Sequence, residues 1–283
     1  MSELRAVRFG GEYDVVAPLY TIAPGVLRAR DLRHGGSLQR WYATDGREAV
    51  AAVDARLRPD DRVFLRFAGD WASYGILSEA ARTELARPLY ATVDGMDATT
   101  LRALEAAGFQ HGHTTEIFRI RFDDALRSLR RSWLPTWARI VSAGDAERDR
   151  LLELDNDVRC DVPGTDGWQG NRAWFDDELA ESPPFDPKGY LVAEDLRNGH
   201  YAGLFRIWRN ESGPRLGLVG TRRPYRPTTI AGALLRAALV AASTWGSDVF
   251  ETEASVSNPV TYQRAAALAT ERFGRRHQMV LPA

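Results

Sequence analysis

Cysteine and long apolar segments are scarce in this chain of 283 residues. Cys160 is the only cysteine, which excludes an intramolecular disulfide and a thiolate cluster for structural zinc. No segment approaches the roughly 20 apolar residues of a membrane span, and the opening residues, MSELRAVRFGGEYD, lack the apolar stretch of a signal peptide. We therefore expect a soluble, cytoplasmic protein with no membrane partner.

The chain also lacks an excess of charge of either sign. It has 37 lysines and arginines against 38 aspartates and glutamates, a formal net charge of -1. A protein that neutralises many phosphates of a nucleic acid is normally strongly basic. We therefore expect no nucleic-acid partner and a small-molecule ligand, in either a monomer or a homodimer.

The histidines and serines form none of the familiar catalytic or metal-binding patterns. No serine lies in a nucleophile-elbow pattern, and no phosphate loop of the GxxxxGK type occurs. Two of the histidines alternate on a probable strand without a carboxylate-rich neighbour, so we expect surface residues and no metal site. The five histidines are His34, His111, His113, His200 and His277.

Two segments of the chain resemble each other. LYATVDGMDATTLRALEAAGF (89–109) and FETEASVSNPVTYQRAAALAT (250–270) each contain a β-prone run, a turn, a helix cap and an apolar helix. Asp97 is a good N-cap in the first; in the second Asn258 caps and Pro259 takes the first helical position. Another β-prone run follows each segment, so the sequence predicts one architecture used twice.

The segment 123–138, DDALRSLRRSWLPTWA, separates the two halves by its charge, Pro135 and two tryptophans. It predicts a first domain over 1–122, a connecting segment over 123–138 and a second domain over 139–283. In the first half we expect a helix near 13–32, strands near 39–57 and 62–67, and a helix near 74–85. Strands followed by helices predict an α/β or α+β fold in each half.

A basic turn in the second half lies between an apolar run and an alanine-rich helix, in LGLVGTRRPYRPTTIAGALL (216–235). The N-terminus of a helix leaves N–H groups without partners and favours an anion. The small residues Thr228, Thr229, Ala231 and Gly232 leave room for close approach, and Arg226 supplies positive charge. The turn predicts a pyrophosphate site; the alternative is that Arg222, Arg223 and Arg226 are solvated surface residues.

Together, LVGTRRPYRPTTIAGALL and ETEASVSN resemble the acetyl-CoA-binding core of the GNAT superfamily of N-acetyltransferases. The family's motif is Arg or Gln, two residues, Gly, one residue, then Gly or Ala. Arg226 matches its first position and Ala231 its last, whereas Thr229 stands in place of the usual glycine. The resemblance implies acetyl-CoA as cofactor, bound by Leu218, Val219, Gly220, Thr221, Arg226, Pro227, Thr228, Thr229, Ile230, Ala231, Gly232 and Asn258.

The resemblance covers nearly the whole chain in the layout of tandem acetyltransferases. It implies two tandem GNAT-like domains, each with a mixed, mostly antiparallel central sheet flanked by helices. In the first half, the counterpart of the basic turn is RFAGDWASYGIL (66–77), where Asp70 stands and no arginine is followed by spaced small residues. We therefore expect a degenerate first domain and a cofactor-binding second domain.

The same resemblance implies candidates for the catalytic base and the catalytic acid. Family members use a carboxylate near the cofactor to accept the amine proton, and Glu253, or Glu251 beside it, occupies such a strand; both can equally be surface residues. The family's usual tyrosine acid corresponds to Ala265, and Tyr262 lies one turn earlier, where a packing role is the alternative. We expect direct attack by the amine on the thioester.

The acceptor is expected near CDVPGTDGWQGNRAWFDDEL (160–179), where relatives place the pocket loop. Asp161, Asp166, Trp168 and Trp174 can bind a cationic or sugar-like amine through charge and stacking, although tryptophans are commonly core and aspartates commonly form turns. The expected function is acetyl-CoA-dependent N-acetylation of a small-molecule amine, such as an aminoglycoside-like antibiotic or specialised metabolite. The alternatives are a noncatalytic acyl-CoA-binding protein and a protein or peptide N-acetyltransferase.

Overall fold

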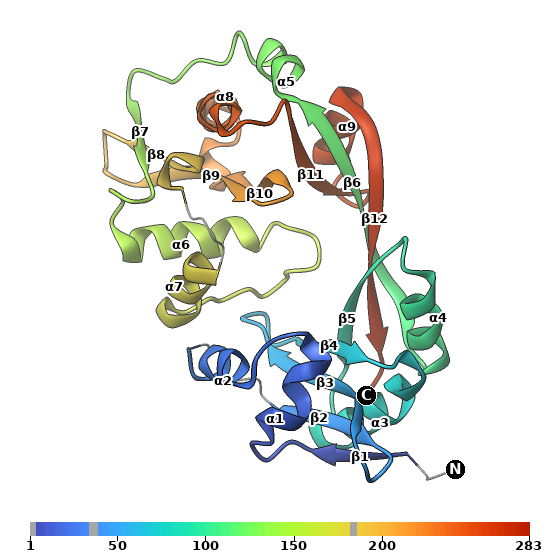
Figure 1. The fold of residues 1–283 in the computed structure, drawn as a ribbon. Coiled ribbons are helices and arrows are strands. Elements are labelled where there is room, and N and C mark those ends of the chain that lie inside the picture. Colours follow the sequence, from blue (N-terminus) through green and yellow to red (C-terminus); the bar gives the residue numbers. More distant parts are fainter. Residues whose placement is uncertain (1–3, 34–38, 182–185) are drawn as a thin grey trace. The chain divides into compact units, whose positions relative to one another are not determined.

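The computed structural model describes residues 4–33, 39–181 and 186–283 and divides into two compact units (Figure 1). The first unit extends to Thr114 and resumes at Arg275, and the second is Thr115–Gly274. Each has a mixed, mostly antiparallel sheet with flanking helices, so the predicted fold class is confirmed. In the described part of the chain, no helix combines the length and apolar character needed to cross a membrane.

The first unit has a sheet in the order β1-β2-β3-β4-β5-β12, in which only β4 and β5 are parallel. The exposed end of β6 also belongs to this unit. Its elements are β1 (Arg5–Arg8), α1 (Tyr13–Val16), η1 (Ala17–Tyr20), α2 (Pro24–Arg33), β2 (Gln39–Thr44), β3 (Ala49–Leu57), β4 (Val63–Gly69), η2 (Trp71–Ser73), α3 (Tyr74–Leu85), β5 (Leu89–Asp94), α4 (Ala98–Ala106), the start of β6 (Gln110–Arg121) and the end of β12 (Ala269–Leu281).

The single helix predicted near 13–32 is wrong, because the segment forms three short helices. Thr21 ends η1 in the left-handed conformation, with φ of 57°. Pro24, which has no backbone N–H, then begins α2. The predicted strand near 39–57 is in fact the hairpin of β2 and β3.

The second unit has a sheet in the order β6-β11-β10-β9-β8-β7, in which only β10 and β11 are parallel. One face packs against α8 through Phe205 and Leu234, and the other packs against α6 and α7 through Leu204 and Phe175. The elements are the end of β6, α5 (Phe122–Ser128), β7 (Ala138–Ser142), α6 (Arg148–Arg159), α7 (Arg172–Glu181), η3 (Pro187–Gly189), β8 (Tyr190–Asp195), β9 (Tyr201–Asn210), β10 (Gly213–Thr221), η4 (Arg223–Tyr225), α8 (Ile230–Ala242), η5 (Ser243–Trp245), β11 (Val249–Ser255), α9 (Pro259–Leu268) and the start of β12.

The predicted internal repeat is present as β5 with α4 and as β11 with α9. Asp97 caps α4 by accepting a hydrogen bond from Thr100 N at 2.9 Å. Asn258 caps α9 by accepting one from Thr261 N at 3.4 Å, and Pro259 takes the first turn. Both predicted caps are therefore confirmed.

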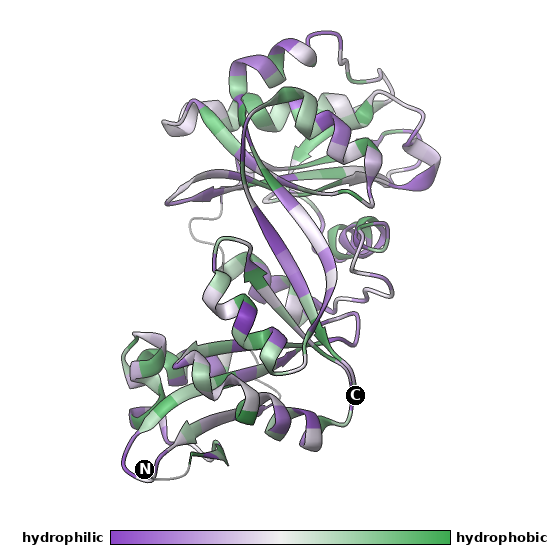
Figure 2. Cartoon of the chain, turned by 90° about the vertical axis from the view of Figure 1, so that its right-hand side faces the viewer, coloured by the Kyte–Doolittle hydropathy of each residue, from purple (hydrophilic) through white to green (hydrophobic). Residues whose placement is uncertain are grey.

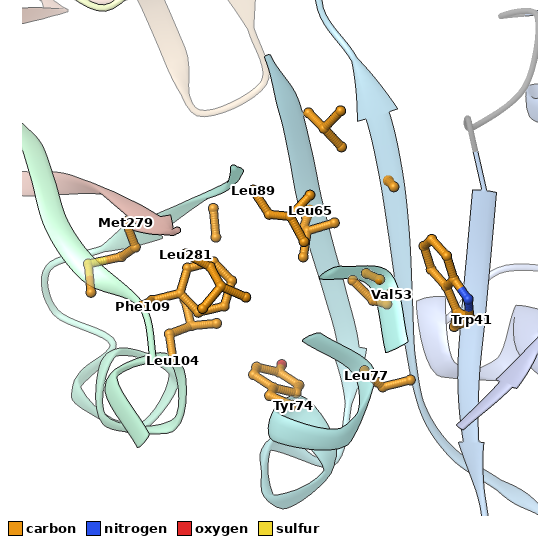
Figure 3. Packing of buried hydrophobic residues seen from close by; sticks show 14 of the residues in the cluster. Trp41, Val53, Leu65, Tyr74, Leu77, Leu89, Leu104, Phe109, Met279 and Leu281 are labelled. Carbon is orange, nitrogen blue, oxygen red and sulfur yellow. The ribbon is translucent and has the colours of Figure 1, made fainter. Parts of the chain in front are cut away.

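The strand after each repeat pairs in the other unit. Residues Thr115 to Arg121 of β6 pair with β11 in the second unit, and Arg276 to Leu281 of β12 pair with β5 in the first. The first part of β12 is largely hydrophilic and exposed (Figure 2). Its last part places Met279 and Leu281 in the first unit's core (Figure 3).

This exchange of strands places the unit boundaries elsewhere than the predicted 1–122 and 139–283. Segment 123–138 lies inside the second unit, and the chain from Arg275 onward lies in the first. The physical reason is that a strand adds to the sheet whose edge it can pair with and whose core can bury its apolar side chains, regardless of its position in the chain.

Shortening Met279 tests the contribution of β12 to the first unit. Its side chain is fully buried, so Met279→Ala should lower the free energy of unfolding by about 2–5 kcal/mol, through lost burial and the cavity that remains. Gln278→Ala, at the neighbouring half-buried position, should cost less than about 1 kcal/mol. Urea unfolding measures both; equal effects would mean that β12 adds no core contact.

Candidate functional site

The parallel strands β10 and β11 pair at a single position, Arg215 with Glu251. Beyond this pair, β10 has an irregularity between Leu216 and Val219 in its pairing with β9. A bulge of this kind bends a strand and turns its edge away from the ladder. The two strands therefore separate just beyond their only paired position.

A cavity of about 580 Å³ lies where the strands separate. Apolar side chains from β9, β10, β11 and α8 form much of its wall, including Phe205, Leu216, Leu235 and Phe250. The volume is within the usual range of small-molecule sites, about 300–1,000 Å³. Its polar lining residues are Ser128, Asp161, Thr221, Arg226, Thr252, Asn258, Thr261 and Arg264.

Much of the predicted cofactor site lines this cavity. The lining includes Val219, Gly220, Thr221, Arg226, Ala231, Gly232 and Asn258. Five predicted residues lie outside it. Leu218 packs on the α6 side of the sheet, and Ile230, the first residue of α8, is buried in the core on the other side. Pro227, Thr228 and Thr229 form the turn before α8.

The first turn of α8 adjoins the cavity through Ala231 and Gly232. Ala233 N donates to Thr229 O at 3.0 Å, and amides that precede such a first bond have no acceptor within the helix. Thr229 has φ of -83° and ψ of 0°, a right-handed conformation open to any residue. The backbone at this position therefore does not require the glycine that the motif usually has.

Gly232 is close to the protein's own chain. A Cβ atom at this position would lie 2.6 Å from Ser132 Oγ and 3.1 Å from Ser132 Cβ. The absence of a side chain therefore admits the segment after α5, as well as leaving Gly232 in the cavity wall.

The three arginines of the basic turn form ion pairs with carboxylates from α6 and the residues just after it. Arg222 contacts Glu153 Oε1 through Nη2 and Asp157 Oδ2 through Nε, each at 2.8 Å. Arg226 pairs with Asp161, and Arg223 Nη2 lies 3.7 Å from the same carboxylate.

These ion pairs do not have the same exposure. The Arg222 side chain is only 15% exposed, so this residue is not a solvated surface arginine. Arg223 and Arg226, with one carboxylate between them, carry an excess positive charge beside the cavity.

Tyr225 positions the basic turn through Asp195. The Tyr225 hydroxyl donates to Asp195 Oδ2 at 3.0 Å, and the same carboxylate accepts bonds from the Arg197 side chain at 2.7 and 2.9 Å. The Arg197 side chain above all, and then the Arg197 backbone N–H and the Tyr225 hydroxyl, hold the pKa of Asp195 well below its usual range. Asp195 therefore fixes the end of β8 to the turn that carries Arg226.

Because the pKa of Asp195 is lower when folded than the ordinary value of about 3.9, its carboxylate stabilises the protein above about pH 4. That stabilisation is lost as the pH falls through the lower, folded-state pKa. We expect Asp195→Asn to lower the urea midpoint at pH 7, and the difference from wild type to narrow toward pH 3. Asp145→Asn, an exposed control, should change the urea midpoint little at either pH. If Asp195→Asn lowered the midpoint equally at pH 7 and pH 3, the lowered pKa of Asp195 would not contribute to stability.

The predicted catalytic residues lie outside the cavity lining. Glu251 accepts bonds from Arg119 at 3.1 Å, and Glu253 accepts one from Arg215 at 2.5 Å. Side chains alternate along a strand, and Thr252, between these glutamates, lines the cavity. Both glutamates therefore face the opposite side of β11.

Tyr262, the predicted acid, also makes contacts away from the cavity lining. Its hydroxyl donates to Glu116 Oε2 at 2.7 Å, and its ring meets Phe118 edge-on at 5.5 Å between centroids. These contacts favour the packing role that the sequence left open.

The predicted acceptor residues divide between the cavity, the surface and the core. Asp161 lines the cavity, Asp166 is exposed, and Trp168 is 3% exposed. Trp174 is half-buried and meets Trp168 edge-on at 4.7 Å, while the Arg159 guanidinium lies 4.6 Å from the Trp168 ring centre. Trp168 therefore packs in the core rather than offering a stacking surface.

A buried charge cluster supports these tryptophans and joins α6 to α7. Arg159 bonds Asp155 at 2.6 Å and Glu178 at 2.6 and 2.8 Å, and Arg206 bonds Glu178 at 3.2 and 3.3 Å. Burial alone would raise the pKa of Glu178, but the two arginines hold it below its usual range. The cluster fixes both ends of the loop that carries Asp161.

Sequence reasoning missed the acidic partners of the basic turn. Glu153, Asp157 and Asp161 recur at intervals of four residues, a spacing that indicates one helix face, so the signal was available. It also missed Thr252 and Arg264 in the cavity wall, for which no local signal exists.

The first unit repeats the strand separation without a basic turn. Its parallel strands β4 and β5 pair at three positions, and a cavity of about 460 Å³ lies beside them. Asp70 stands at the corresponding turn and caps η2 by accepting a bond from Ala72 N at 3.0 Å. The turn after β4 therefore carries the acidic Asp70, whereas the turn before α8 carries the basic Arg226.

The four histidines that the structure describes lie apart from the second unit's cavity lining. His111 bonds Glu105 at 3.0 Å and meets the His277 ring edge-on at 5.2 Å, while His34 lies outside the described residues. Across residues 4–33, 39–181 and 186–283, no group of three or more His, Cys, Asp or Glu side chains is arranged to hold a metal ion.

Comparison with solved structures identifies this fold. A tandem GNAT protein from the clavulanic acid biosynthesis pathway matches 99% of this chain and 98% of its own, with a TM-score of 0.67 and 16% identity. A GCN5-related N-acetyltransferase from Sphaerobacter thermophilus matches 98% of this chain and 95% of its own, with a TM-score of 0.60 and 17% identity.

A fungal glucosamine N-acetyltransferase region, part of a multi-domain β-N-acetylglucosaminidase, matches 99% of this chain and 38% of that longer one, with a TM-score of 0.64 and 13% identity. No protein-family model and no curated protein sequence matches the chain. The chain therefore has the tandem GNAT fold, and its predicted resemblance to that superfamily is confirmed at the level of fold.

Proposed function

We propose that the protein is an acetyl-CoA-dependent N-acetyltransferase whose second unit, Thr115–Gly274, binds the cofactor. The observation that carries the proposal is the cavity at the separation of β10 and β11, which meets both the first turn of α8 and Arg226. A helix N-terminus with an adjacent arginine suits a pyrophosphate, and an unpaired strand edge suits an amide-containing arm. The first unit, whose corresponding turn carries Asp70, is the degenerate copy.

The residues that would hold acetyl-CoA follow from this geometry. Arg226 and the first-turn amides of α8 would bind the phosphates, and the β10 edge from Val219 to Thr221 would bind the pantetheine arm. Asn258 lines the cavity from α9 and is a further candidate contact. Acetyl-CoA supplies the activated acetyl thioester, and a backbone N–H near Val219 would polarise its carbonyl.

The separation of the strands also supports a role for Glu253. The strands β10 and β11 leave a gap beyond their paired residues Arg215 and Glu251. Glu253 lies two residues further along β11, on the face away from the cavity. An amine approaching from that face would reach the thioester through the gap. Glu253 would accept its proton, with Glu251 as the second candidate, while Tyr262 is bonded to Glu116 and is the weaker candidate for the acid.

A small-molecule amine is the acceptor that we propose. Two similar structures carry names from small-molecule chemistry, one a glucosamine N-acetyltransferase region and the other a protein of clavulanic acid biosynthesis. Exposed Asp166 on the loop after α6 would attract a cationic amine, whereas the Asp161 carboxylate is paired with Arg226 and Arg223. The buried Trp168 is not proposed as a contact.

Reversal of charge at Arg226 tests the cofactor site. Arg226→Glu should weaken acetyl-CoA binding by about 30-fold or more, because it places a carboxylate beside the phosphates. The thermal shift that millimolar acetyl-CoA gives the wild type should therefore largely disappear. The matched control Asp70→Ala, at the corresponding turn of the first unit, should keep the wild-type shift.

The thermal shifts of the wild type and the two variants show which unit, if either, binds acetyl-CoA. A shift lost in Asp70→Ala and kept in Arg226→Glu would mean that the first unit binds the cofactor. No shift for the wild type at millimolar acetyl-CoA would exclude both the proposed enzyme and a noncatalytic acyl-CoA-binding protein.

Glu253→Gln tests the proposed base. With an acceptor found by thiol release over aminoglycosides, polyamines, amino acids and peptides, kcat should fall about 100-fold or more while acetyl-CoA affinity is unchanged. Glu251→Gln, which removes the neighbouring carboxylate and its pair with Arg119, is the matched control and should lose less. A wild-type kcat for Glu253→Gln would remove Glu253 from the mechanism.

The same screen addresses the two alternatives. Binding of acetyl-CoA without thiol release from any amine would favour a noncatalytic binder. Release with peptides alone would favour a protein or peptide N-acetyltransferase.

A further inference from the structure

We propose that Asp161 is an internal anion of the cofactor site: its carboxylate occupies the position on Arg226 and Arg223 that the phosphates of acetyl-CoA take, and it thereby lowers affinity for the cofactor. This inference rests on the proposed function. It concerns a residue that the sequence suggested for the acceptor, whereas its contacts are with the basic turn.

The charges of the turn are divided unequally. Arg222 has two carboxylates, from Glu153 and Asp157, and is largely buried against α6. Arg223 and Arg226 share the single carboxylate of Asp161. Arg222 is therefore committed to joining the turn to α6, and the other two arginines are the pair that an incoming anion can reach.

Because these side chains are exposed, a phosphate group can replace the Asp161 carboxylate on the two arginines. The side chains of Asp161 and Arg226 are 38% and 46% exposed, and Arg223 is 82% exposed. Ion pairs at such positions contribute little to stability, because water competes for both partners. A pyrophosphate, which carries more charge and also meets the first-turn amides of α8, would replace one carboxylate.

The loop that carries Asp161 is held independently of the arginines. Thr165 Oγ1 lies 2.6 Å from Arg159 O and 2.8 Å from Val162 O, the two acceptors for its single proton. The Asn156 side chain bonds both N and O of Gly170 at 2.8 and 2.9 Å. Exchange therefore requires only rotation of the Asp161 side chain. After exchange the carboxylate remains near the bound phosphates, so its repulsion persists in the complex.

Substitution of Asp161 by its neutral isostere tests the inference. Titration calorimetry at low ionic strength should show that Asp161→Asn binds acetyl-CoA about five-fold tighter than wild type or more. Acetyl-pantetheine, which has the same thioester and no phosphates, should bind both proteins equally. The gain should shrink in 0.5 M salt, since mobile ions screen exposed charges.

Two further variants make the result specific. Asp149→Asn removes the same charge and breaks an exposed pair with Arg172 elsewhere on the unit, so it should leave acetyl-CoA affinity within two-fold. In an Arg226→Gln background the gain from Asp161→Asn should diminish, because the partner of the carboxylate is gone.

Each outcome has a separate meaning. If the wild type binds acetyl-CoA and Asp161→Asn binds equally or more weakly, the inference is wrong and the proposed function stands. An equal gain with acetyl-pantetheine would also overturn it, because the effect would not involve phosphates. If neither folded protein binds acetyl-CoA, the proposed function and this inference both fail.

Discussion

A single paired position between two parallel strands determines the geometry of the second unit. Because β10 and β11 meet only at Arg215 and Glu251, their edges beyond that pair are directed into a cavity instead of into a ladder. The helix that follows each strand then borders the same space, so that the first turns of α8 and α9 contribute to its wall. The first unit has a related separation between β4 and β5, but different charges surround it.

Local charge balance explains how a chain with a net charge of -1 can carry a strongly basic turn. The acids of α6 and the loop after it lie against the arginines, so the turn is neutralised within its own unit and not by the chain as a whole. Asp195 and Tyr225 fix the same turn from β8. The position of Arg226 thus depends on three elements distant from it in sequence.

Features governed by neighbouring residues could be predicted from the sequence. The caps at Asp97 and Asn258, the strand and helix of each repeat and the basic turn depend on short-range chemistry, and they form as expected. Pro18 and Pro24 are local signals against one long first helix, because proline interrupts the backbone hydrogen bonds of a helix interior.

Features governed by tertiary contacts could not be predicted in this way. The burial of Trp168 depends on Arg159 and Trp174, and the distance of Glu253 from the cavity lining depends on which face of β11 meets α8. Only the spacing of Glu153, Asp157 and Asp161 offered a signal for the partners of the turn, and it required knowing where α6 lies.

Because β6 pairs with β11 and β12 pairs with β5, each unit is completed by a strand that follows the other half's repeat in the chain. On the ribosome, β5 is made long before residues 276–281, so the edge with which it pairs to β12 stays open until those residues have emerged. The earlier half therefore completes its fold last. Deleting either half would also remove a strand from the half that remains.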